Sequence, residues 1–112
     1  MSNFDAQPIN NSGDNVFKNI PVAEKEVSYF QQFLDSHDFS RHTVRAFGFD
    51  LCKFAKFFFS VNNERYDTTR VTTTDITSFK RHLREDLGQS VSTVNRALVS
   101  VRKYLGWFLR FQ

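Results

Sequence analysis

The sequence has few of the residues that form disulfides, tight turns or membrane spans. It holds one cysteine, two prolines and four glycines in 112 residues. The single cysteine, Cys52, excludes an internal disulfide and a cysteine-rich zinc site, and it favours a reducing, cytoplasmic setting. No run approaches the roughly 18 unbroken apolar residues of a membrane span, and the polar start does not resemble a secretory signal. We therefore expect a cytoplasmic protein with no membrane partner.

The sequence also lacks the usual motifs of catalysis, cofactor binding and metal binding. His37, His42 and His82 do not have the spacing of metal ligands, so we interpret them as solvated side chains. Cys52 lies beside a predicted core position, and we expect a buried structural thiol with no histidine or lysine placed to activate it. No glycine-rich phosphate loop and no pair of carboxylates suited to acid–base catalysis occurs. We predict no catalytic residue, no metal and no cofactor.

Phenylalanine is abundant, with fourteen copies, and it supplies the apolar area for one compact domain. The charge is uneven along the chain. Residues 1–39 carry two Lys/Arg against six Asp/Glu, whereas residues 40–112 carry thirteen against six. A basic body behind an acidic lead-in suggests an anionic partner such as nucleic acid, and a merely solvated helical surface is the alternative.

Hydrophobic periodicity and capping residues predict four helices. Residues 1–20 show no period, so we expect a disordered arm there. The clearest apolar stripe, at spacings of three and four, is formed by Val44, Phe47, Leu51, Phe54 and Phe58. The first predicted helix covers 22–37 with Pro21 in its first turn, and the second runs from N-cap Ser40 to about residue 59. The third runs from Thr74 to an inward-facing Leu87 before Gly88, and the fourth runs from Ser90 or Ser92 to the chain end. A longer loop, 60–73, separates two pairs of helices.

The second and fourth predicted helices each carry basic residues opposite their apolar stripes. These residues are Arg41, His42, Arg45, Lys53 and Lys56 on the second helix and Arg96, Lys103 and Arg110 on the fourth. Small hydroxyl and amide side chains near the helix starts could hold phosphate oxygens, while Arg and Asn could reach base edges. The alternative is structural: Ser40, Ser92 and Thr93 would only cap helices, and Arg96 would pair with an acid such as Glu85 or Asp86.

Three segments of the chain, in order, resemble the segments of a known protein family. Residues 39–58 (FSRHTVRAFGFDLCKFAKFF) resemble the pattern S-x-x-T-x-x-x-Y-x-x-D-L-x-x-F through Ser40, Thr43, Asp50, Leu51 and Phe54. Residues 71–83 resemble the next family segment. Residues 89–109 resemble a third through Ser92, Thr93, Asn95, Arg96, Leu98, Arg102 and Phe108. Together the three segments resemble the N-terminal core-binding, or SAM-like, domain of tyrosine recombinases and phage integrases. Phe47 stands where the family often has Tyr, and Gly48 where a polar or basic residue is more usual.

The resemblance implies an all-α, four-helix SAM-like orthogonal bundle of two helical hairpins, formed by residues 21–112 behind the arm. Such a domain is half of a clamp that grips duplex core-site DNA for integration or recombination. The implied DNA contacts are Ser40, Arg41, Thr43, Arg45 and Lys53 on the second helix and Ser92, Thr93, Asn95, Arg96 and Lys103 on the fourth.

The resemblance also implies which partners the chain has. Strand cleavage would belong to a C-terminal catalytic domain of the same protein, so this chain alone is not an enzyme. Tyr104 would be a packing residue rather than a nucleophile, and protomers would contact one another on DNA. A helical protein–protein interaction module with no nucleic-acid role is the alternative, because Phe49, Phe57, Phe59, Trp107 and Phe111 cannot all lie on the main apolar stripes.

Overall fold

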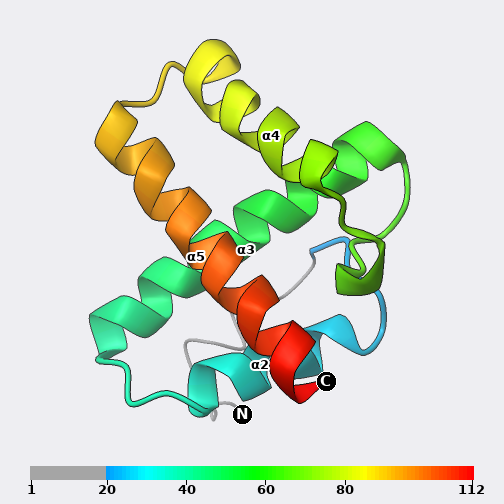
Figure 1. Cartoon of the computed structure of the whole chain (residues 1–112), viewed down its shortest axis with the longest axis vertical. Helices are drawn as coiled ribbons and strands as arrows, with labels where there is room; N and C mark the ends of the chain where they lie inside the picture. The colour runs from blue at the N-terminus through cyan, green and yellow to red at the C-terminus, as the bar shows by residue number, and fades with distance from the viewer. Residues whose placement is uncertain (1–19) are drawn as a thin grey trace, which may run out of the picture.

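A computed structural model of the chain describes residues 20–112, so nearly all of the arm expected at residues 1–20 lies outside the described part. Figure 1 shows two helical hairpins, α2–α3 and α4–α5, with α5 crossing α3 near the middle of both helices. The predicted all-α bundle of four helices is confirmed for the described residues. The elements are α2 (Glu26–Asp35), α3 (Arg41–Asn62), the 3-10 turn η1 (Thr68–Arg70), α4 (Thr73–Arg81), the π-helical turn η2 (His82–Asp86) and α5 (Val91–Phe111).

The two long helices, α3 and α5, begin with the same capping arrangement. Ser40 Oγ accepts a hydrogen bond from the backbone N–H of Thr43, and Ser90 Oγ accepts one from Thr93, both at 3.2 Å. Ser90 rather than Ser92 therefore caps α5, because its oxygen satisfies one of the N–H groups that a helix start leaves unpaired. Gly88 has φ of +62°, which confirms it as the left-handed stop before α5.

The first helix begins later than predicted. Residues 21–23 are not helical, and Val22 forms an isolated parallel bridge with Tyr66 in the loop after α3. Tyr66 N–H donates to Pro21 O, and Ala23 N–H donates to Tyr66 O, both at 2.8 Å. The prediction of a helix from Val22 with Pro21 in its first turn is wrong, because this long-range backbone pairing competes with the helix and Glu26 is the first helical residue.

The connection between the hairpins is shorter and more ordered than the predicted loop over 60–73. Helix α3 continues to Asn62, and α4 begins with Thr72 as N-cap rather than at Thr74. Thr72 and Asp75 form a reciprocal capping box, in which Asp75 Oδ2 accepts from Thr72 N–H at 2.8 Å. Between the two helices, η1 forms one further turn.

The end of the α4–η2 segment also differs from the prediction. Leu87 N–H donates to the carbonyl of His82 five residues earlier, at 3.1 Å. In this wider turn Leu87 no longer has the position relative to the buried Leu83 that an α-helix would give it. The prediction that Leu87 faces inward is therefore wrong, and its side chain is 52% exposed.

The core is largely aromatic and includes one buried carboxylate. Tyr104 is fully buried, which confirms it as a packing residue, and its ring meets those of Phe30 and Phe33 edge-on. Glu26 is 2% exposed and accepts from Thr68 N–H at 3.0 Å, from Thr68 Oγ1 at 2.7 Å and from Tyr104 Oη. These hydrogen bonds join α2, η1 and α5.

Cys52 is buried on α3, as predicted. Burial raises the pKa of its thiol from 9.0 to about 11, while the charge of Lys56, one helical turn further on, lowers the pKa in part. The expectation that no lysine is placed near this thiol is therefore wrong, but burial has the larger effect and the thiol is not activated. None of the helices in residues 20–112 is long and apolar enough to cross a bilayer.

Candidate nucleic-acid interface

The first turns of α3 and α5 diverge from the helix crossing and leave a groove between them. The groove has a volume of about 560 Å³. Helix α3 contributes His42, Thr43, Ala46 and Phe47 to its lining, and α5 contributes Arg96, Val99 and Ser100. The floor is therefore apolar, and one guanidinium group stands on the α5 side.

Asp50 lies at the crossing of the two helices and has no exposed surface. Its Oδ1 accepts from Arg96 Nη2 at 3.0 Å, and its Oδ2 accepts from Ser100 Oγ at 2.7 Å. A buried charge is costly unless it is paired and hydrogen-bonded, and here α5 supplies both partners. The Arg96 side chain is nevertheless 55% exposed, so only part of its guanidinium is used by Asp50.

Five residues of the predicted interface lie on α3 or at its N-cap, and they do not share one face. Thr43 lines the groove, and the half-buried Lys53 follows Asp50 by three residues on the same side. At about 100° per residue, Arg45 lies about 140° around the helix from Asp50, and Arg41 lies on the opposite side. Both arginines are exposed. The structure thus places them away from the α5 side.

The other five predicted residues lie on α5 and are closer together. Ser92, Arg96 and Lys103 follow one another at spacings of four and seven, so they share a stripe, with the exposed Asn95 at its edge. Lys103 Nζ lies 5.7 Å from the centroid of the Phe39 ring. Thr93 Oγ1 accepts from the capping Ser90 Oγ at 3.0 Å, so it belongs to the helix cap.

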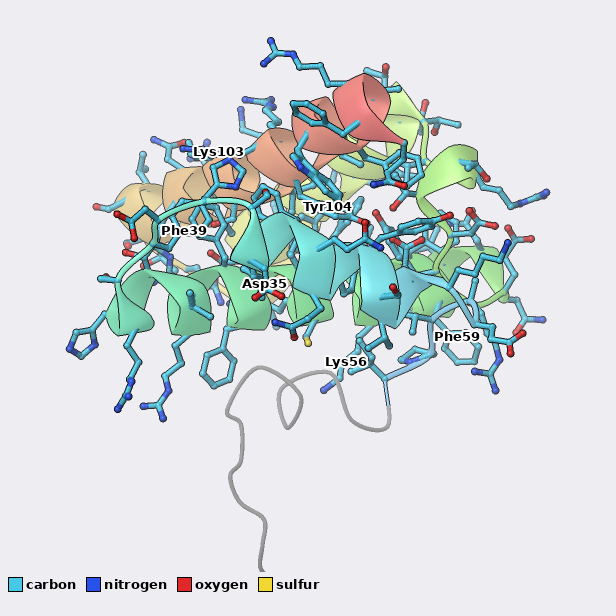
Figure 2. All side chains as sticks on the ribbon, turned by 90° about the horizontal axis from the view of Figure 1, so that it is seen from below. Asp35, Phe39, Lys56, Phe59, Lys103 and Tyr104 are labelled. Carbon is cyan, nitrogen blue, oxygen red and sulfur yellow. The ribbon has the colours of Figure 1, made fainter. Side chains whose placement is uncertain are left out.

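Figure 2 separates the two sides of α3. Lys103 lies with Phe39 on the side where α5 crosses, whereas Lys56 and Phe59 project from the opposite side. Helices α3 and α5 carry four Lys/Arg each, and their one acidic residue is the paired Asp50. The rest of the chain holds seven Lys/Arg against eleven Asp/Glu. The positive charge of the molecule is therefore concentrated on the crossed helices.

The sequence did not reveal that Asp50 is the partner of Arg96. The structural alternative paired Arg96 with Glu85 or Asp86, but Asp86 Oδ2 lies 2.9 Å from His82 Nδ1 instead. The two members of the Asp50–Arg96 pair are 46 residues apart, and no local pattern connects them. The only signal for Asp50 was its place in the family pattern.

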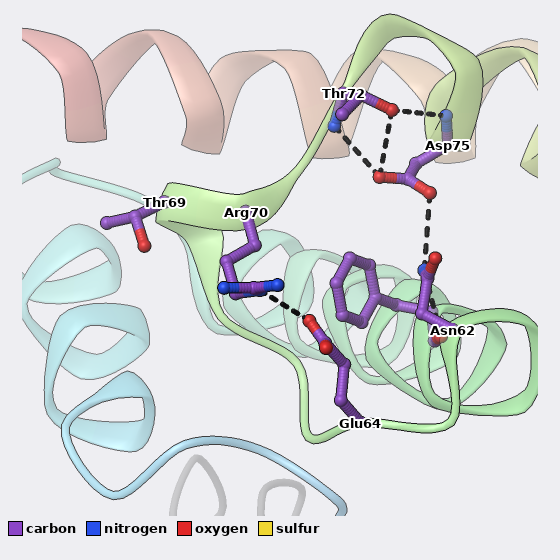
Figure 3. Close-up of a pocket in the computed structure, with 7 residues that line it drawn as sticks. Asn62, Glu64, Thr69, Arg70, Thr72 and Asp75 are labelled. Atoms are coloured by element: carbon purple, nitrogen blue, oxygen red, sulfur yellow. Dashed lines mark hydrogen bonds and ion pairs between the residues drawn. The ribbon is translucent and has the colours of Figure 1, made fainter.

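A second hollow, of about 400 Å³, lies where α3 connects to α4 (Figure 3). Its polar side chains bind one another. Arg70 Nε donates to Glu64 Oε1, and Asn62 Nδ2 donates to Asp75 Oδ1 at 3.3 Å, while the other Asp75 oxygen serves the capping box. These contacts stabilise the connection between the hairpins, and the hollow is a weaker candidate for a binding site than the groove.

The three histidines differ in their surroundings. His42 is exposed beside the groove, His37 stacks on Phe39 with centroids 4.6 Å apart, and His82 stacks on Phe57 at 5.1 Å. The interpretation as solvated side chains therefore holds fully for His42 alone. Within residues 20–112, no cluster of three or more His, Cys, Asp or Glu side chains is arranged to hold a metal ion.

Comparison with known protein families gave a match that covers most of the chain. The family model described as "Phage integrase, N-terminal SAM-like domain" matches residues 27–112, and no catalytic domain is evident in the chain. The searches of curated proteins and of solved structures gave no significant match. The matched range includes α3, α5 and every residue of the predicted interface.

Proposed function

The chain belongs to the family of N-terminal SAM-like domains of phage integrases, and we propose that it binds duplex DNA through the two basic helices α3 and α5. The observation that carries this proposal is the concentration of charge. Eight Lys/Arg lie on these two helices with one acidic residue, which is itself paired. Neutralisation of phosphates by Lys and Arg supplies most of the affinity of non-specific DNA binding.

The geometry suits a polyanion better than a small anion. Arg96, Lys103 and Arg110 repeat every seven residues along α5, so they form an extended row rather than a pocket. Thr43 adds a hydroxyl in the groove, and Ser92 adds one on α5, one turn before Arg96. Lys53 adds an ammonium group near the crossing. Hydroxyls and cations of this kind hold backbone oxygens, and Arg96 and Asn95 have the donors that recognise base edges.

The same proposal gives different roles to four further residues, which are Ser40, Thr93, Arg41 and Arg45. Ser40 caps α3, and Thr93 binds the capping Ser90 of α5, so these two residues fix the helix starts at the DNA. Arg41 and Arg45 contact phosphates beside α3, on the side that faces away from α5. This arrangement requires the first turns of α3 to enter the DNA groove, so that both sides of the helix meet backbone.

We further propose that DNA binding serves integration or recombination by a tyrosine recombinase. In this proposal the chain is half of a clamp, and a C-terminal catalytic domain of the same protein cuts and rejoins strands. Protomers bound to neighbouring sites would contact one another. The support for these steps is family membership together with the basic face.

The direct test is duplex binding by fluorescence anisotropy at low salt. We expect a Kd of about 10⁻⁴–10⁻⁶ M, within the non-specific range. About six neutralised phosphates would give a slope of log K against log salt near −5. Arg96→Ala and Arg45→Ala should each weaken binding. The loss of Arg45, a phosphate contact, should also reduce the magnitude of the slope by roughly one.

Lys25→Ala is the matched control for charge. Lys25 is exposed, lies at the start of α2 and is remote in sequence from both basic helices. The substitution Lys25→Ala removes one positive charge and should leave the slope of log K against log salt unchanged. Unchanged affinity in both arginine variants, with folding verified by circular dichroism, would overturn the proposal.

A second candidate function is protein–protein interaction. Phe49, Phe59 and Phe111 are 61%, 42% and 65% exposed, and exposed aromatic residues mark interfaces. Trp107, which the alternative also invoked, is buried and does not support it. Weak DNA binding that does not depend on Arg45 or Arg96 would favour this second function.

A further inference from the structure

The pair formed by Asp50 and Arg96 combines a fully buried acid with a half-exposed base. Asp50 receives one hydrogen bond from Arg96 Nη2 and one from Ser100 Oγ. Ser100 is itself buried, and its hydroxyl also lies 3.2 Å from the carbonyl of Arg96. Arg96 is therefore bonded to a carboxylate that cannot move without breaking hydrogen bonds inside the bundle.

The guanidinium of Arg96 keeps donors for a ligand. A guanidinium has five N–H donors in one rigid plane, and Asp50 takes a bond from one nitrogen. A lysine in its place would be a single flexible point charge. Fixing one edge of the plane fixes the direction of the other donors, and this lowers the ordering cost when a ligand binds.

We propose that Asp50 is a positioning residue, which holds the guanidinium of Arg96 at the groove so that its remaining donors face DNA. This inference rests on the proposed function of the α3–α5 face. Asp50 itself does not contact DNA, because it has no exposed surface. Its effect on binding passes through Arg96 alone.

For Asp50→Asn, the proposal predicts a change in DNA affinity opposite in sign to the change expected from net charge alone. Asp50 is the one acidic residue on the two basic helices. If it acted only through its charge, Asp50→Asn would strengthen DNA binding, since the substitution removes a negative charge near a polyanion. If Asp50 positions Arg96, the same substitution weakens binding despite the gain in positive charge.

The test is a double-mutant cycle with Asp50→Asn and Arg96→Ala, read by anisotropy at several salt concentrations. With Arg96 present, we expect Asp50→Asn to weaken binding about 3- to 10-fold, as coupled neighbours do. In the Arg96→Ala background, Asp50→Asn should strengthen binding slightly. The sign of the effect therefore changes with Arg96, which a general loss of structure would not produce.

Two further variants keep the test informative if Asp50→Asn folds poorly. Ser100→Ala removes one of the two donors to Asp50 without changing any charge, and we expect a loss of about 2-fold that disappears in the Arg96→Ala background. Arg96→Lys keeps the charge but loses the rigid fork, and its affinity should be close to that of Arg96→Ala. Arg102→Lys, an exposed residue on the same helix, is the matched control and should bind like the parent chain.

The outcomes separate this inference from the proposed function. Stronger binding by Asp50→Asn in both backgrounds, or full affinity in Arg96→Lys, overturns the positioning role and leaves DNA binding intact. Indifference of binding to both Arg96→Ala and Arg45→Ala overturns DNA binding by helices α3 and α5, and the positioning role with it.

Discussion

Tyr104 and Glu26 are 78 residues apart in sequence, yet the phenol of Tyr104 donates a hydrogen bond to the buried carboxylate of Glu26. Burial and the neighbouring carboxylate both raise the pKa of Tyr104, so the phenol stays protonated and remains a donor. Thr68 completes the contact from the loop after α3. One buried carboxyl group thus connects the first helix, the inter-hairpin turn and the last helix.

The first prediction concerns this buried contact. Tyr104→Phe should lower the free energy of unfolding by about 1–3 kcal/mol, because the carboxylate of Glu26 loses a donor that water cannot replace. Urea unfolding measures the change. Tyr29→Phe is the control, since Tyr29 is half-buried and packs its ring edge-on against Phe108. Equal stability of the Tyr104→Phe variant and the parent chain would contradict the assigned role.

The second prediction concerns alkaline pH. The pKa of Cys52 is raised from 9.0 to about 11, and burial also raises the pKa values of Tyr66 and Tyr104. Between pH 9 and pH 11 the unfolded chain releases the thiol proton while the folded chain retains it. Unfolding is then accompanied by proton release, so stability falls as pH rises, by up to roughly 1.4 kcal/mol per pH unit for this one group.

Unfolding measured at pH 8, 9 and 10 checks this trend. Cys52→Ala should be less stable than the parent chain at pH 8 because it removes a buried side chain, but its stability should fall less between pH 9 and pH 10. A parent chain whose stability rises over this range would contradict the prediction.

The third prediction compares two glycines. Gly88 has φ of +62°, so Gly88→Ala should destabilise the domain by about 1–2 kcal/mol through backbone strain. Gly106 lies inside α5, and an added Cβ would meet no atom within 4 Å. Gly106→Ala should therefore stabilise the domain by about 0.5–1 kcal/mol. Thermal melts of the two variants should shift in opposite directions.

The fourth prediction compares two serines at the start of α5. Ser90→Ala removes the oxygen that accepts from Thr93 N–H, and it should cost about 1 kcal/mol. Ser92→Ala should change stability by less than about 0.5 kcal/mol, since Ser92 is an exposed residue within the first turn. If Ser92→Ala weakens DNA binding without affecting stability, its place in the proposed interface is supported; equal loss of stability in both variants would show that the cap is wrongly assigned.

Local signals predicted the long helices well. The stripe from Val44 to Phe58 is buried apart from the half-buried Val44, and Ser40 caps α3 as expected. Such features depend on residues three or four positions apart, which a single sequence displays directly. The order of the three family-like segments identified the fold for the same reason. Each segment falls on one helix, so its pattern can be recognised from nearby residues alone.

Long-range contacts explain what the sequence did not predict. Pro21 fits a first helical turn by local rules, but its carbonyl accepts from Tyr66 in an extended segment. Glu26 suits a helix start electrostatically, yet it is buried against Thr68 and Tyr104. Tertiary packing overrode local preference at both positions. For the interface, spacing along α5 was predictable, but the side of α3 that faces α5 was not, so Arg45 and Arg96 were placed together.

The bridge between residues 21–23 and Tyr66 has a practical consequence for anyone who prepares this domain. The family match begins at residue 27, but Ile20, Val22 and Glu26 are buried in the core. A fragment that begins at residue 27 would lack the buried side chains of Ile20 and Val22 and would leave a cavity in their place. It would also lack Glu26, the carboxylate that Tyr104 and Thr68 bind. The shortest recombinant version that keeps the native interior therefore begins no later than Ile20.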